Sequence, residues 1–241
     1  MLVLGLPDSI RACLFDLDGV LTDTAAVHRA AWKSVFDTVL AEHGQSPFTE
    51  DDYNEYVDGK PRLDGVRDFL TSRDLKIDEG SPDDSADAET VHGIATRKNV
   101  DLLRRIRSDG VEVYRGSWLY VEAAARNHIP RVVVSSSANT GEVLHATGLD
   151  RLITQYVDGN TIEEQGLAGK PAPDSFLAGA RLAGAQPANC AVFEDATSGV
   201  EAGRRGGFGF VVGVNRLDQA HARALDKHGA DTVIDDLADL L

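Results

Sequence analysis

Five short apolar segments recur along the chain, and each ends on polar or small residues. Their hydrophobic residues are continuous rather than alternating, which is typical of strands buried on both faces of a parallel sheet. Helix-like segments separate most of them, and alternation of strand and helix predicts a doubly wound α/β core. The predicted strands are residues 11–18, 131–137, 190–196, 209–214 and 232–236.

Segments between these strands carry helix start and stop signals. The predicted helices of the core are residues 117–127, 139–148, 174–184 and 218–229. Their candidate first residues are Ser117, Asn139, Asp174 and Asp218. Glu142 follows Asn139 by three positions, which is the spacing of a capping box. Gly184 and Gly229 are predicted to end the last two helices.

The alternation is interrupted from about Thr24 to Arg105, where the sequence contains no good strand. Residues 25–44 form a strong amphipathic helix pattern, and further helical segments are predicted around 50–58, 62–73 and 98–107. The acidic stretch 78–89 is predicted to be a solvated loop. We therefore expect a helical cap domain of residues 25–105, inserted into a core of residues 1–24 and 106–241. Inserted helical domains often act as lids.

Composition and charge limit the kinds of molecule that the protein can bind. The 241-residue chain carries a formal net charge of −15, which argues against nucleic-acid binding and against attraction to anionic membranes. Cys13 and Cys190 lie in apolar runs without metal-ligand spacing, as in buried, reduced thiols. The N-terminus lacks a basic n-region, and no apolar run approaches the roughly 20 residues of a membrane span. We expect a cytoplasmic monomer that acts on a small molecule.

Polar side chains cluster at the ends of three predicted strands. Asp16 and Asp18 end the first, the serines at 135–137 end the second, and Glu194 and Asp195 end another. Ligands of open parallel sheets bind beyond the carboxyl ends of the strands, so these groups are expected at one edge. Lys170, in the proline-rich segment "GKPAPD", is expected to join them.

Four carboxylates gathered in one place require a cation, and an all-oxygen ligand set suits Mg²⁺. With Mg²⁺ and Lys170 present, a phosphate group can approach. Serine hydroxyls and the helix that follows Asn139 can donate hydrogen bonds to its oxygens. A phosphate in line with Asp16 indicates covalent catalysis through an aspartyl phosphate. Asp18, two residues later, can act as general acid and base.

Four segments resemble, in order, the four motifs of the haloacid dehalogenase superfamily, and the resemblance spans nearly the whole chain. They are "DLDGVLTDT", "SSSAN", "GKPAPD" and "FEDATSGVEAG". The helical cap after the first motif resembles the first cap class of that family. Three features are similar to the β-phosphoglucomutase-like subfamily. They are "TDTAAVHRAAWK", "DGKPRLDGV", and "SSSAN" followed by "GKPAPD".

The resemblance implies roles for the residues of the core. Asp16 would be the nucleophile and a Mg²⁺ ligand, and Asp18 the general acid and base, with its backbone carbonyl on Mg²⁺. Asp195 would bind Mg²⁺, and Glu194 would bind it directly or through water. Ser135 and Lys170 would hold the transferring phosphate. Ser136, Ser137 and Asn139 are further candidates for substrate binding, although the serines at 136 and 137 would equally suit the turn into the following helix.

In the cap, the resemblance implies that Thr24 and His28 lie at a hinge, where His28 would help to place Asp18. Gly59, Lys60 and Arg62 would contribute to the substrate site. Arg62 would bind the non-transferring phosphate, a task that suits a planar bidentate donor.

Three positions depart from the subfamily pattern. Asp58 stands before Gly59 where the pattern has lysine, Ala138 stands where the better-known mutases carry lysine, and "YRG" (114–116) replaces "YPG". These changes leave the catalytic motifs intact and leave the sugar open.

The resemblance favours a mutase that converts β-glucose 1-phosphate to glucose 6-phosphate through glucose 1,6-bisphosphate. A phosphatase acting on a sugar phosphate or another small metabolite is the alternative. A regulatory module that only binds phosphate is disfavoured, because receiver-like modules lack a large cap.

Overall fold

The computed structural model describes residues 4–58 and 60–241. The chain separates into two compact units. The first, here called the core, runs up to Asp23 and resumes at Val111–Leu241; the second, the cap, is Thr24–Gly110. Within the described residues, no helix combines the length and the apolar character needed to cross a bilayer.

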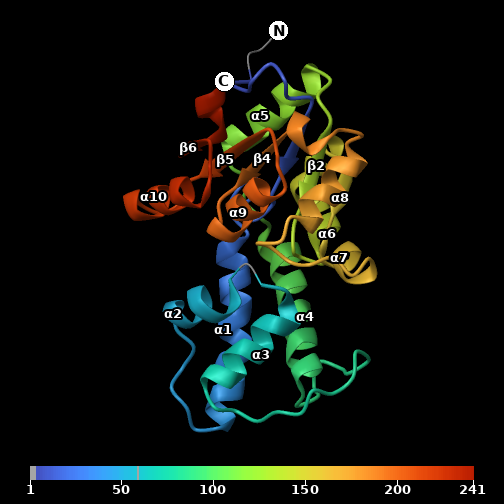
Figure 1. Cartoon of the computed structure of the whole chain (residues 1–241). Helices are drawn as coiled ribbons and strands as arrows, with labels where there is room; N and C mark the ends of the chain where they lie inside the picture. Colours follow the sequence, from blue (N-terminus) through green and yellow to red (C-terminus); the bar gives the residue numbers. More distant parts are fainter. Residues whose placement is uncertain (1–3, 59) are drawn as a thin grey trace. The chain divides into compact units, whose positions relative to one another are not determined.

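A parallel sheet forms the centre of the core, in the strand order β3-β2-β1-β4-β5-β6 (Figure 1). Its strands are β1 (Ala12–Phe15), β2 (Arg131–Val134), β3 (Gln155–Val157), β4 (Cys190–Glu194), β5 (Phe210–Val214) and β6 (Thr232–Ile234). β1 lies between β2 and β4, with Phe15 paired to Val133 on one side and to Phe193 on the other. Aligned strand ends therefore bring the residues that follow Phe15, Val134 and Phe193 to one edge.

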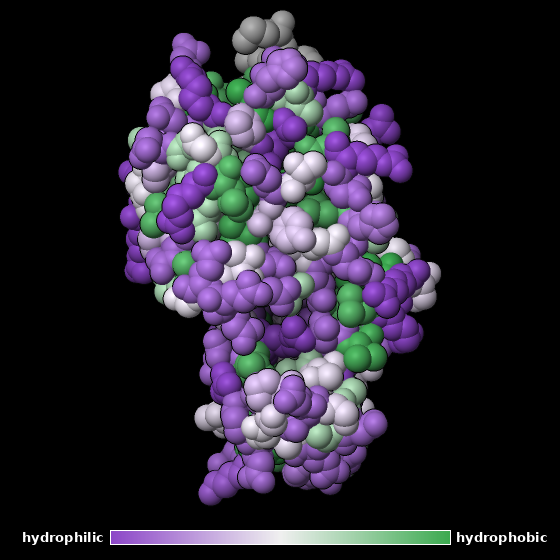
Figure 2. All heavy atoms as spheres, turned by 90° about the vertical axis from the view of Figure 1, so that its right-hand side faces the viewer, coloured by the Kyte–Doolittle hydropathy of each residue, from purple (hydrophilic) through white to green (hydrophobic). Residues whose placement is uncertain are grey.

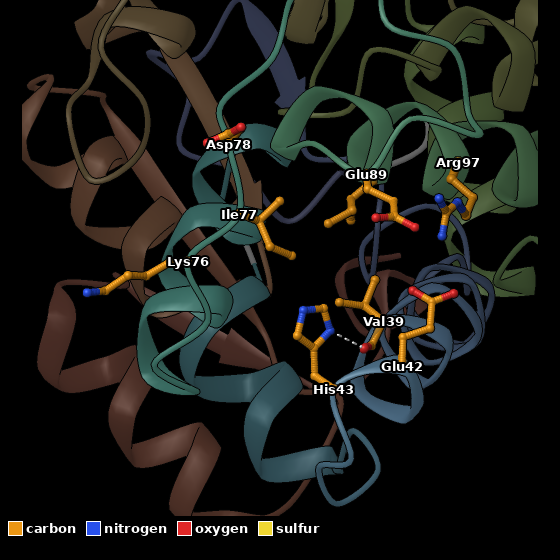
Figure 3. A pocket seen from close by; sticks show the side chains of 9 residues that line it. Val39, Glu42, His43, Lys76, Ile77, Asp78, Glu89 and Arg97 are labelled. Atoms are coloured by element: carbon orange, nitrogen blue, oxygen red, sulfur yellow. Dashed lines mark hydrogen bonds between the residues drawn. The ribbon is translucent and has the colours of Figure 1, made fainter.

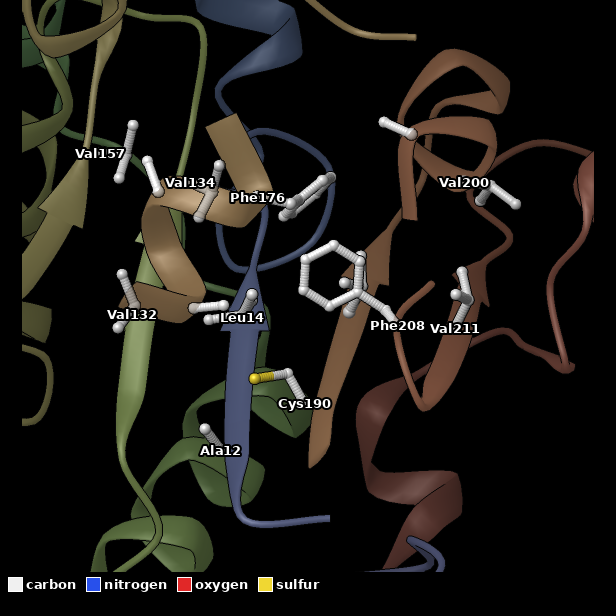
Figure 4. Close-up of a cluster of buried hydrophobic side chains, with 14 of the residues drawn as sticks. Ala12, Leu14, Val132, Val134, Val157, Phe176, Cys190, Val200, Phe208 and Val211 are labelled. Atoms are coloured by element: carbon white, nitrogen blue, oxygen red, sulfur yellow. The ribbon is translucent and has the colours of Figure 1, made fainter. Parts of the chain in front are cut away.

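Both faces of the sheet are buried, which explains the continuous apolar runs. Leu14 and Val192 face helices on one side, in a cluster that includes Phe176 of α8 and Val200 of α9 (Figure 4). On the other face Phe15 and Phe193 stack at 4.6 Å, and Tyr120 of α5 packs against both. The predicted doubly wound α/β fold class is confirmed.

The helices of the core follow the strands in chain order. They are α5 (Arg115–Arg126), α6 (Thr140–Thr147), α7 (Gly159–Glu164), α8 (Asp174–Leu182), α9 (Thr197–Arg205) and α10 (Gln219–His228), with short 3₁₀ turns η2 (Leu149–Arg151), η3 (Pro187–Asn189) and η4 (Leu237–Leu240). Asp218 caps α10 by accepting hydrogen bonds from two backbone N–H groups, and Gly229 ends the helix in a left-handed conformation, as predicted. Gly184, also at positive φ, lies just beyond α8.

One predicted cap, Ser117, and one predicted capping box, Asn139 with Glu142, are wrong. Ser117 lies inside α5, which begins at Arg115, and its hydroxyl donates to the Val20 carbonyl instead (2.6 Å). Asn139 is the N-cap residue of α6, but no side-chain capping hydrogen bond forms there, so the capping box with Glu142 is absent. Asp174 is the first residue of α8, and Pro173 is the cap.

The edge strand β3 was not predicted from the sequence. It has three residues, and Gln155 and Tyr156 are exposed, so it lacks the apolar run that marks the inner strands. The opposite edge strand, β6, also has three residues, whereas β4 and β5 in the interior have five each.

The cap is built from helices around an aromatic cluster. Its elements are α1 (Ala25–Glu42), α2 (Glu50–Asp52), the π-helix η1 (Tyr53–Val57), α3 (Arg62–Ser72) and α4 (Val91–Asp109). Phe36 of α1 lies 4.1 Å from Phe69 of α3 and stacks on Trp32 at 5.0 Å, measured between ring centroids. The predicted all-helical character holds for the described residues of the cap, and residues 78–89 form no helix or strand.

α4 is longer than predicted, because it begins seven residues before the expected start at 98. Thr90 caps it by accepting a hydrogen bond from Gly93 N–H (3.0 Å). The helix continues to Asp109, so the cap ends at Gly110 rather than at the expected residue 105.

Hydrophilic residues cover most of the face shown in Figure 2. Such a surface agrees with the 26% of charged residues in the sequence.

Candidate active site

The first group of candidate residues lies on the turn that follows β1. Asp16 continues the strand, since its N–H donates to the Phe193 carbonyl (2.9 Å), and its side chain is buried. The turn then closes through hydrogen bonds from Leu21 N–H and Thr22 N–H to the Leu17 carbonyl. Asp18 is carried on this closed turn, so its position depends on the geometry of the turn.

Lys170 lies between two carboxylates. Its ammonium donates to Asp16 Oδ1 (2.5 Å) and to Glu194 Oε1 (2.5 Å), and it lies 4.8 Å from the centroid of the Phe176 ring. All three charged side chains are almost fully buried, with side-chain exposures of 6% for Lys170, 10% for Asp16 and 1% for Glu194. A buried charged group is tolerated when it is paired and hydrogen-bonded, and Lys170 meets both conditions.

The electrostatics of this cluster are dominated by burial. Burial raises the pKa of Asp16 to about 8, because the attraction of Lys170 does not compensate for desolvation and for the negative charges of Glu194 and Asp18. Burial also disfavours the charged form of Lys170, but Asp16 and Glu194 outweigh it and raise the lysine pKa. Lys170 is therefore a permanent cation, and the carboxylates around it exceed its charge.

The loop after β2 carries the serines. Ser135 Oγ makes a long contact of 3.5 Å to Asp18 Oδ2, and it accepts a hydrogen bond from Ser137 N–H (3.1 Å). Ser137 Oγ in turn accepts from Asn139 N–H (3.2 Å) at the start of α6. Ser135 thus lies beside the carboxylates, whereas Ser137 serves the turn into the helix. Ser136 lies half-buried between them on the same loop.

Glu194 ends β4 and Asp195 follows it, and glycines let other segments approach both residues closely. Glu194 Oε2 accepts a hydrogen bond from Ala196 N–H (2.8 Å), and a Cβ at Gly199 would lie 1.9 Å from its Oε1. Asp195 packs against the turn after β1, since a Cβ at Gly19 would lie 1.8 Å from its Oδ2. Gly19 also has φ +82°, a conformation that favours glycine. The structure therefore brings Asp16, Asp18, Ser135, Lys170, Glu194 and Asp195 to the same edge of the sheet.

The carboxylates fit a divalent cation in number and in chemistry. Asp16, Asp18, Glu194 and Asp195 offer only oxygen atoms, the donors that Mg²⁺ prefers, and the Lys170 ammonium pairs with two of them. Over residues 4–58 and 60–241, no three His, Cys, Asp or Glu side chains stand in an arrangement ready to hold a metal ion. The Lys170 ammonium bridges Asp16 and Glu194.

A second buried cluster of basic groups lies inside the cap. The ammonium of Lys98 lies 3.1 Å from His28 Nδ1 and 5.0 Å from the centroid of the Trp32 ring, and Lys98 is 3% exposed. Burial lowers the pKa of His28 well below its usual value, and the charges of Lys98 and Arg62 lower it further. His28 is therefore neutral at pH 7, and its Nε2 atom is buried without a hydrogen-bond partner.

The remaining predicted cap residues have different surroundings. Arg62 begins α3, and its Nη1 makes a long contact of 3.5 Å to the Ala95 carbonyl of α4. Lys60 forms a partly exposed ion pair with Asp68 (2.6 Å). Thr24 is buried at the start of α1 without a side-chain capping bond. Gly59 lies outside the described residues.

Lys98 was not predicted from the sequence, although a signal was present. It occupies the same helical stripe as Val91, Ala95 and Leu102, which are all buried. A lysine on an otherwise apolar stripe of a helix indicates a buried cation. Its contact His28 lies 70 residues away in the sequence, so no local pattern predicts the pair.

The cap also contains a cavity of about 220 Å³ (Figure 3). Val39, Ile77 and Ile94 supply apolar lining, and the remaining lining residues are Glu42, His43, Lys76, Asp78, Glu89 and Arg97. Among the predicted site residues that the structure describes, none lines this cavity.

Comparison with known proteins places this geometry in a family. The model of the haloacid dehalogenase-like hydrolases matches residues 10–207. The chain is 56% identical to a β-phosphoglucomutase of Mycobacterium bovis and to one of Mycobacterium tuberculosis, over 99% of this chain and 94% of each relative. It is 26% identical to the fructose-1-phosphate phosphatase YqaB of Escherichia coli, over 80% of this chain and 91% of that protein.

A solved structure gives the same result. The crystal structure of a β-phosphoglucomutase from Clostridium difficile matches with a TM-score of 0.78 and 26% identity, over 96% of this chain and 93% of that one. With the four motif segments meeting at one sheet edge and a helical cap inserted after the first, the chain belongs to the haloacid dehalogenase superfamily and to its β-phosphoglucomutase-like subfamily.

Proposed function

We propose that this protein is a phosphomutase that interconverts β-glucose 1-phosphate and glucose 6-phosphate through glucose 1,6-bisphosphate. The buried cluster of Asp16, Lys170 and Glu194, with Asp18 and Ser135 beside it, carries the chemical part of the proposal. The 56% identity to curated β-phosphoglucomutases over nearly the whole chain supports the choice of reaction.

In the first half-reaction, a carboxylate oxygen of Asp16 attacks the phosphorus of the bound bisphosphate. The bond between phosphorus and the sugar oxygen breaks, and Asp18 gives its proton to the departing oxygen. In the second half-reaction a hydroxyl of the other sugar phosphate attacks the aspartyl phosphate, and Asp18 takes up the hydroxyl proton. Asp16 is thereby regenerated, and one phosphoryl group has moved.

Lys170 and Ser135 stabilise the phosphoryl group during both steps. Lys170 lies 2.5 Å from the attacking carboxylate, so its charge acts where negative charge builds up on the transferring oxygens. Ser135 Oγ, near Asp18, can donate a hydrogen bond to the same group.

Mg²⁺ fits the surplus of carboxylates, with Asp16, the Asp18 carbonyl, Glu194 and Asp195 as its proposed ligands. When bound, the ion supplies positive charge that neutralises the phosphoryl oxygens and the carboxylates during transfer.

The cap supplies the second requirement of a mutase, a site for the phosphate that is not transferred. Lys98 lies 3.1 Å from His28 Nδ1 within the cap, and the charges of Lys98 and Arg62 both lower the pKa of His28. A guanidinium binds phosphate through two parallel hydrogen bonds, which makes Arg62 the primary contact. We propose that Lys98 adds charge to this site and keeps His28 neutral.

The alternative is a phosphatase that uses the same core and transfers the phosphoryl group to water. One observation favours it. Asp58 stands where the mutase pattern has lysine, and Lys60 forms an ion pair with Asp68. This removes one cation from the proposed second phosphate site.

A product analysis separates the two functions. Purified protein is incubated with β-glucose 1-phosphate, Mg²⁺ and a catalytic amount of glucose 1,6-bisphosphate, and glucose 6-phosphate and free phosphate are both measured. We expect glucose 6-phosphate without equivalent release of phosphate. Phosphate release alone would identify a phosphatase, and an Asp16→Asn sample controls for contaminating enzymes.

Arg62→Ala tests the second phosphate site directly. We expect it to lower kcat/KM for the glucose phosphates by about 10²-fold, the cost of losing a charge-assisted bidentate contact of about 3 kcal/mol. Turnover of a short phosphate ester, which has no second phosphate, should change little. The exposed Arg126→Ala on α5 is the matched control. Equal losses on both substrates would argue against this role for Arg62.

A cytoplasmic location and a monomeric state stay predictions from the sequence.

A further inference from the structure

The segment that follows β5 contacts two of the loops that carry the proposed catalytic and metal-binding residues, the loop after β1 and the loop after β4. Arg216, two residues beyond β5, reaches the turn after β1. Its Nε donates to the Gly19 carbonyl (2.6 Å) and its Nη2 to the Val20 carbonyl (3.2 Å). Its Nη1 donates to the Asp235 carbonyl (2.9 Å), beyond β6. One guanidinium thus joins three backbone carbonyls from two distant segments.

The guanidinium of Arg216 is held in place by an aromatic ring. Its Cζ lies 3.7 Å from the centroid of the Tyr114 ring, which fixes the plane of the donors. Tyr114 is itself tied to the same turn, because its N–H donates to the Leu21 carbonyl (3.1 Å). A planar donor fixed on an aromatic face loses less conformational entropy per hydrogen bond than a flexible lysine would.

The same segment also supports the loop after β4. His221 Nε2 lies 2.9 Å from the Asp195 carbonyl oxygen, and its Nδ1 lies 3.0 Å from Oδ1 of Asn215, which adjoins Arg216. Asn215 is oriented in turn by a hydrogen bond from its Nδ2 to Asp235 (2.8 Å). Because Asp195 packs directly on Gly19, the two catalytic loops and the segment 215–221 form a closed ring of contacts.

This ring restrains the residue next to the general acid. Gly19 follows Asp18, adopts φ +82°, and donates its N–H to the Thr22 carbonyl (2.8 Å). A glycine permits many backbone conformations, so the turn requires outside contacts to keep one of them. Arg216 supplies such contacts on the two carbonyls that follow Asp18.

We propose that Arg216 is a positioning residue that orients Asp18 for proton transfer by fixing the Gly19–Val20 turn. The inference rests on the proposed function, since it assigns Asp18 the proton transfer. Arg216 donates to backbone carbonyls and acts on the reaction through the turn. A misplacement of about 1 Å in a catalytic group costs about 10²-fold in rate, which sets the expected effect.

The test compares two phosphoryl donors that differ in their need for an acid. The leaving group of a sugar phosphate is a sugar alkoxide, which requires the proton of Asp18. The leaving group of acetyl phosphate is acetate, which requires no proton. For each variant we would measure kcat and KM on the sugar phosphate and the rate at which acetyl phosphate phosphorylates the protein. The variants are Arg216→Ala, Arg216→Lys, Asp18→Asn and the exposed control Arg223→Ala.

We expect Arg216→Ala to lower kcat on the sugar phosphate by about 10- to 100-fold, with KM changed by less than about threefold. Phosphorylation by acetyl phosphate should stay within about threefold of the wild-type rate. Arg216→Lys, which keeps the charge and folds with less disturbance, should show the same pattern with a smaller loss. In the Asp18→Asn background, Arg216→Ala should cause no further loss of kcat on the sugar phosphate, because both changes impair the same proton transfer.

Equal slowing of both donors by Arg216→Ala and Arg216→Lys would overturn the proposal, because it would indicate a general structural role. An additive loss in the Asp18→Asn background would overturn it too. Isomerisation and hydrolysis both require protonation of the leaving alkoxide. The products therefore decide between mutase and phosphatase, while the ratio of the two donor rates decides the role of Arg216.

Discussion

Two lysines of this protein have largely buried side chains in opposite surroundings. In the core, Lys170 lies between Asp16 and Glu194, and both carboxylates raise its pKa. In the cap, Lys98 lies against a neutral histidine and the face of Trp32, and with Arg62 it lowers the pKa of His28. The core site gathers several carboxylates around one lysine, whereas in the cap the charges of a lysine and an arginine act on one histidine.

The difference indicates what each site can bind. Surplus carboxylates in the core favour a cation, which then allows a phosphoryl group to approach. Buried basic groups in the cap favour an anion directly. A mutase needs both, because its bisphosphate intermediate presents one phosphate for transfer and one that is only held. The following predictions test this contrast, from the largest expected effect to the smallest.

Asp16→Asn should give the largest loss. The amide cannot serve as the nucleophile, so we expect turnover to fall by about 10⁴-fold or more, as when a nucleophile is removed from other covalent enzymes. The thermal unfolding transition should be retained, because the amide keeps the shape of the carboxylate. Turnover and incorporation of labelled phosphate into the protein are the measurements. Retained incorporation would show that another residue is the nucleophile.

Lys170→Met tests the charge balance of the core site. It leaves Asp16 and Glu194 buried without the ammonium between them, so the free energy of unfolding should fall by about 3–5 kcal/mol. Mg²⁺ should then raise the melting temperature more than it does in the wild type, because the site has gained net negative charge. Denaturant unfolding with and without Mg²⁺ measures both effects, and the exposed Lys227→Met is the control. A smaller Mg²⁺ effect in the variant would contradict our view of the cluster.

Lys98→Met tests the role of the buried lysine in the cap. Removing this charge should raise the pKa of His28 toward its usual value, since Lys98 is one of the causes that lower it. It should also raise KM for glucose 1-phosphate about tenfold, which corresponds to about 1.4 kcal/mol. An NMR titration of the imidazole signals and steady-state kinetics measure the two effects. The exposed Lys76→Met in the same unit should change neither, and an unaltered His28 pKa would rule out the coupling.

The stability of the cap should depend on pH through His28. Its pKa in the folded protein lies below the value of about 6.5 expected for the unfolded chain, so the unfolded state binds the proton more readily. The contribution of neutral His28 to the free energy of unfolding is thus complete above about pH 6.5. It is lost as the pH falls toward the pKa of His28 in the folded protein, by at most about 1.4 kcal/mol per pH unit.

Urea unfolding at several pH values between 7.5 and 5 would measure this dependence, with His28→Gln as the comparison. The variant should lose less stability than the wild type over that interval. His43→Gln, at the exposed end of α1, should behave like the wild type. Parallel curves for the wild type and His28→Gln would exclude a contribution from His28.

Much of the core site could be predicted because its residues follow strands. Asp16, Ser135 and Glu194 each end a continuous apolar run, and parallel strands bring such ends together without further information. Lys170 was predictable only through its motif, since a loop residue carries no periodic signal. The local hydrogen bonds were less predictable. Ser117 bonds to a carbonyl 97 residues away instead of capping its helix.

The cap cluster and the contacts of Arg216 could not be predicted in the same way. Lys98 meets His28 because α1 and α4 pack together, and no local pattern encodes that pairing. Arg216 lies 197 residues from the Gly19 carbonyl that it contacts. Such contacts depend on tertiary structure, and they are common among residues that support a site rather than perform its chemistry.

The outermost strands β3 and β6 bear on the solubility of the fold. An edge strand exposes unpaired N–H and C=O groups, and a long, flat edge can pair with a strand from another molecule. Here each edge has three residues, while the five-residue strands are enclosed within the sheet. The regular, strongly apolar strands are thus shielded from neighbouring molecules, and an extended chain finds only a short edge on which to add.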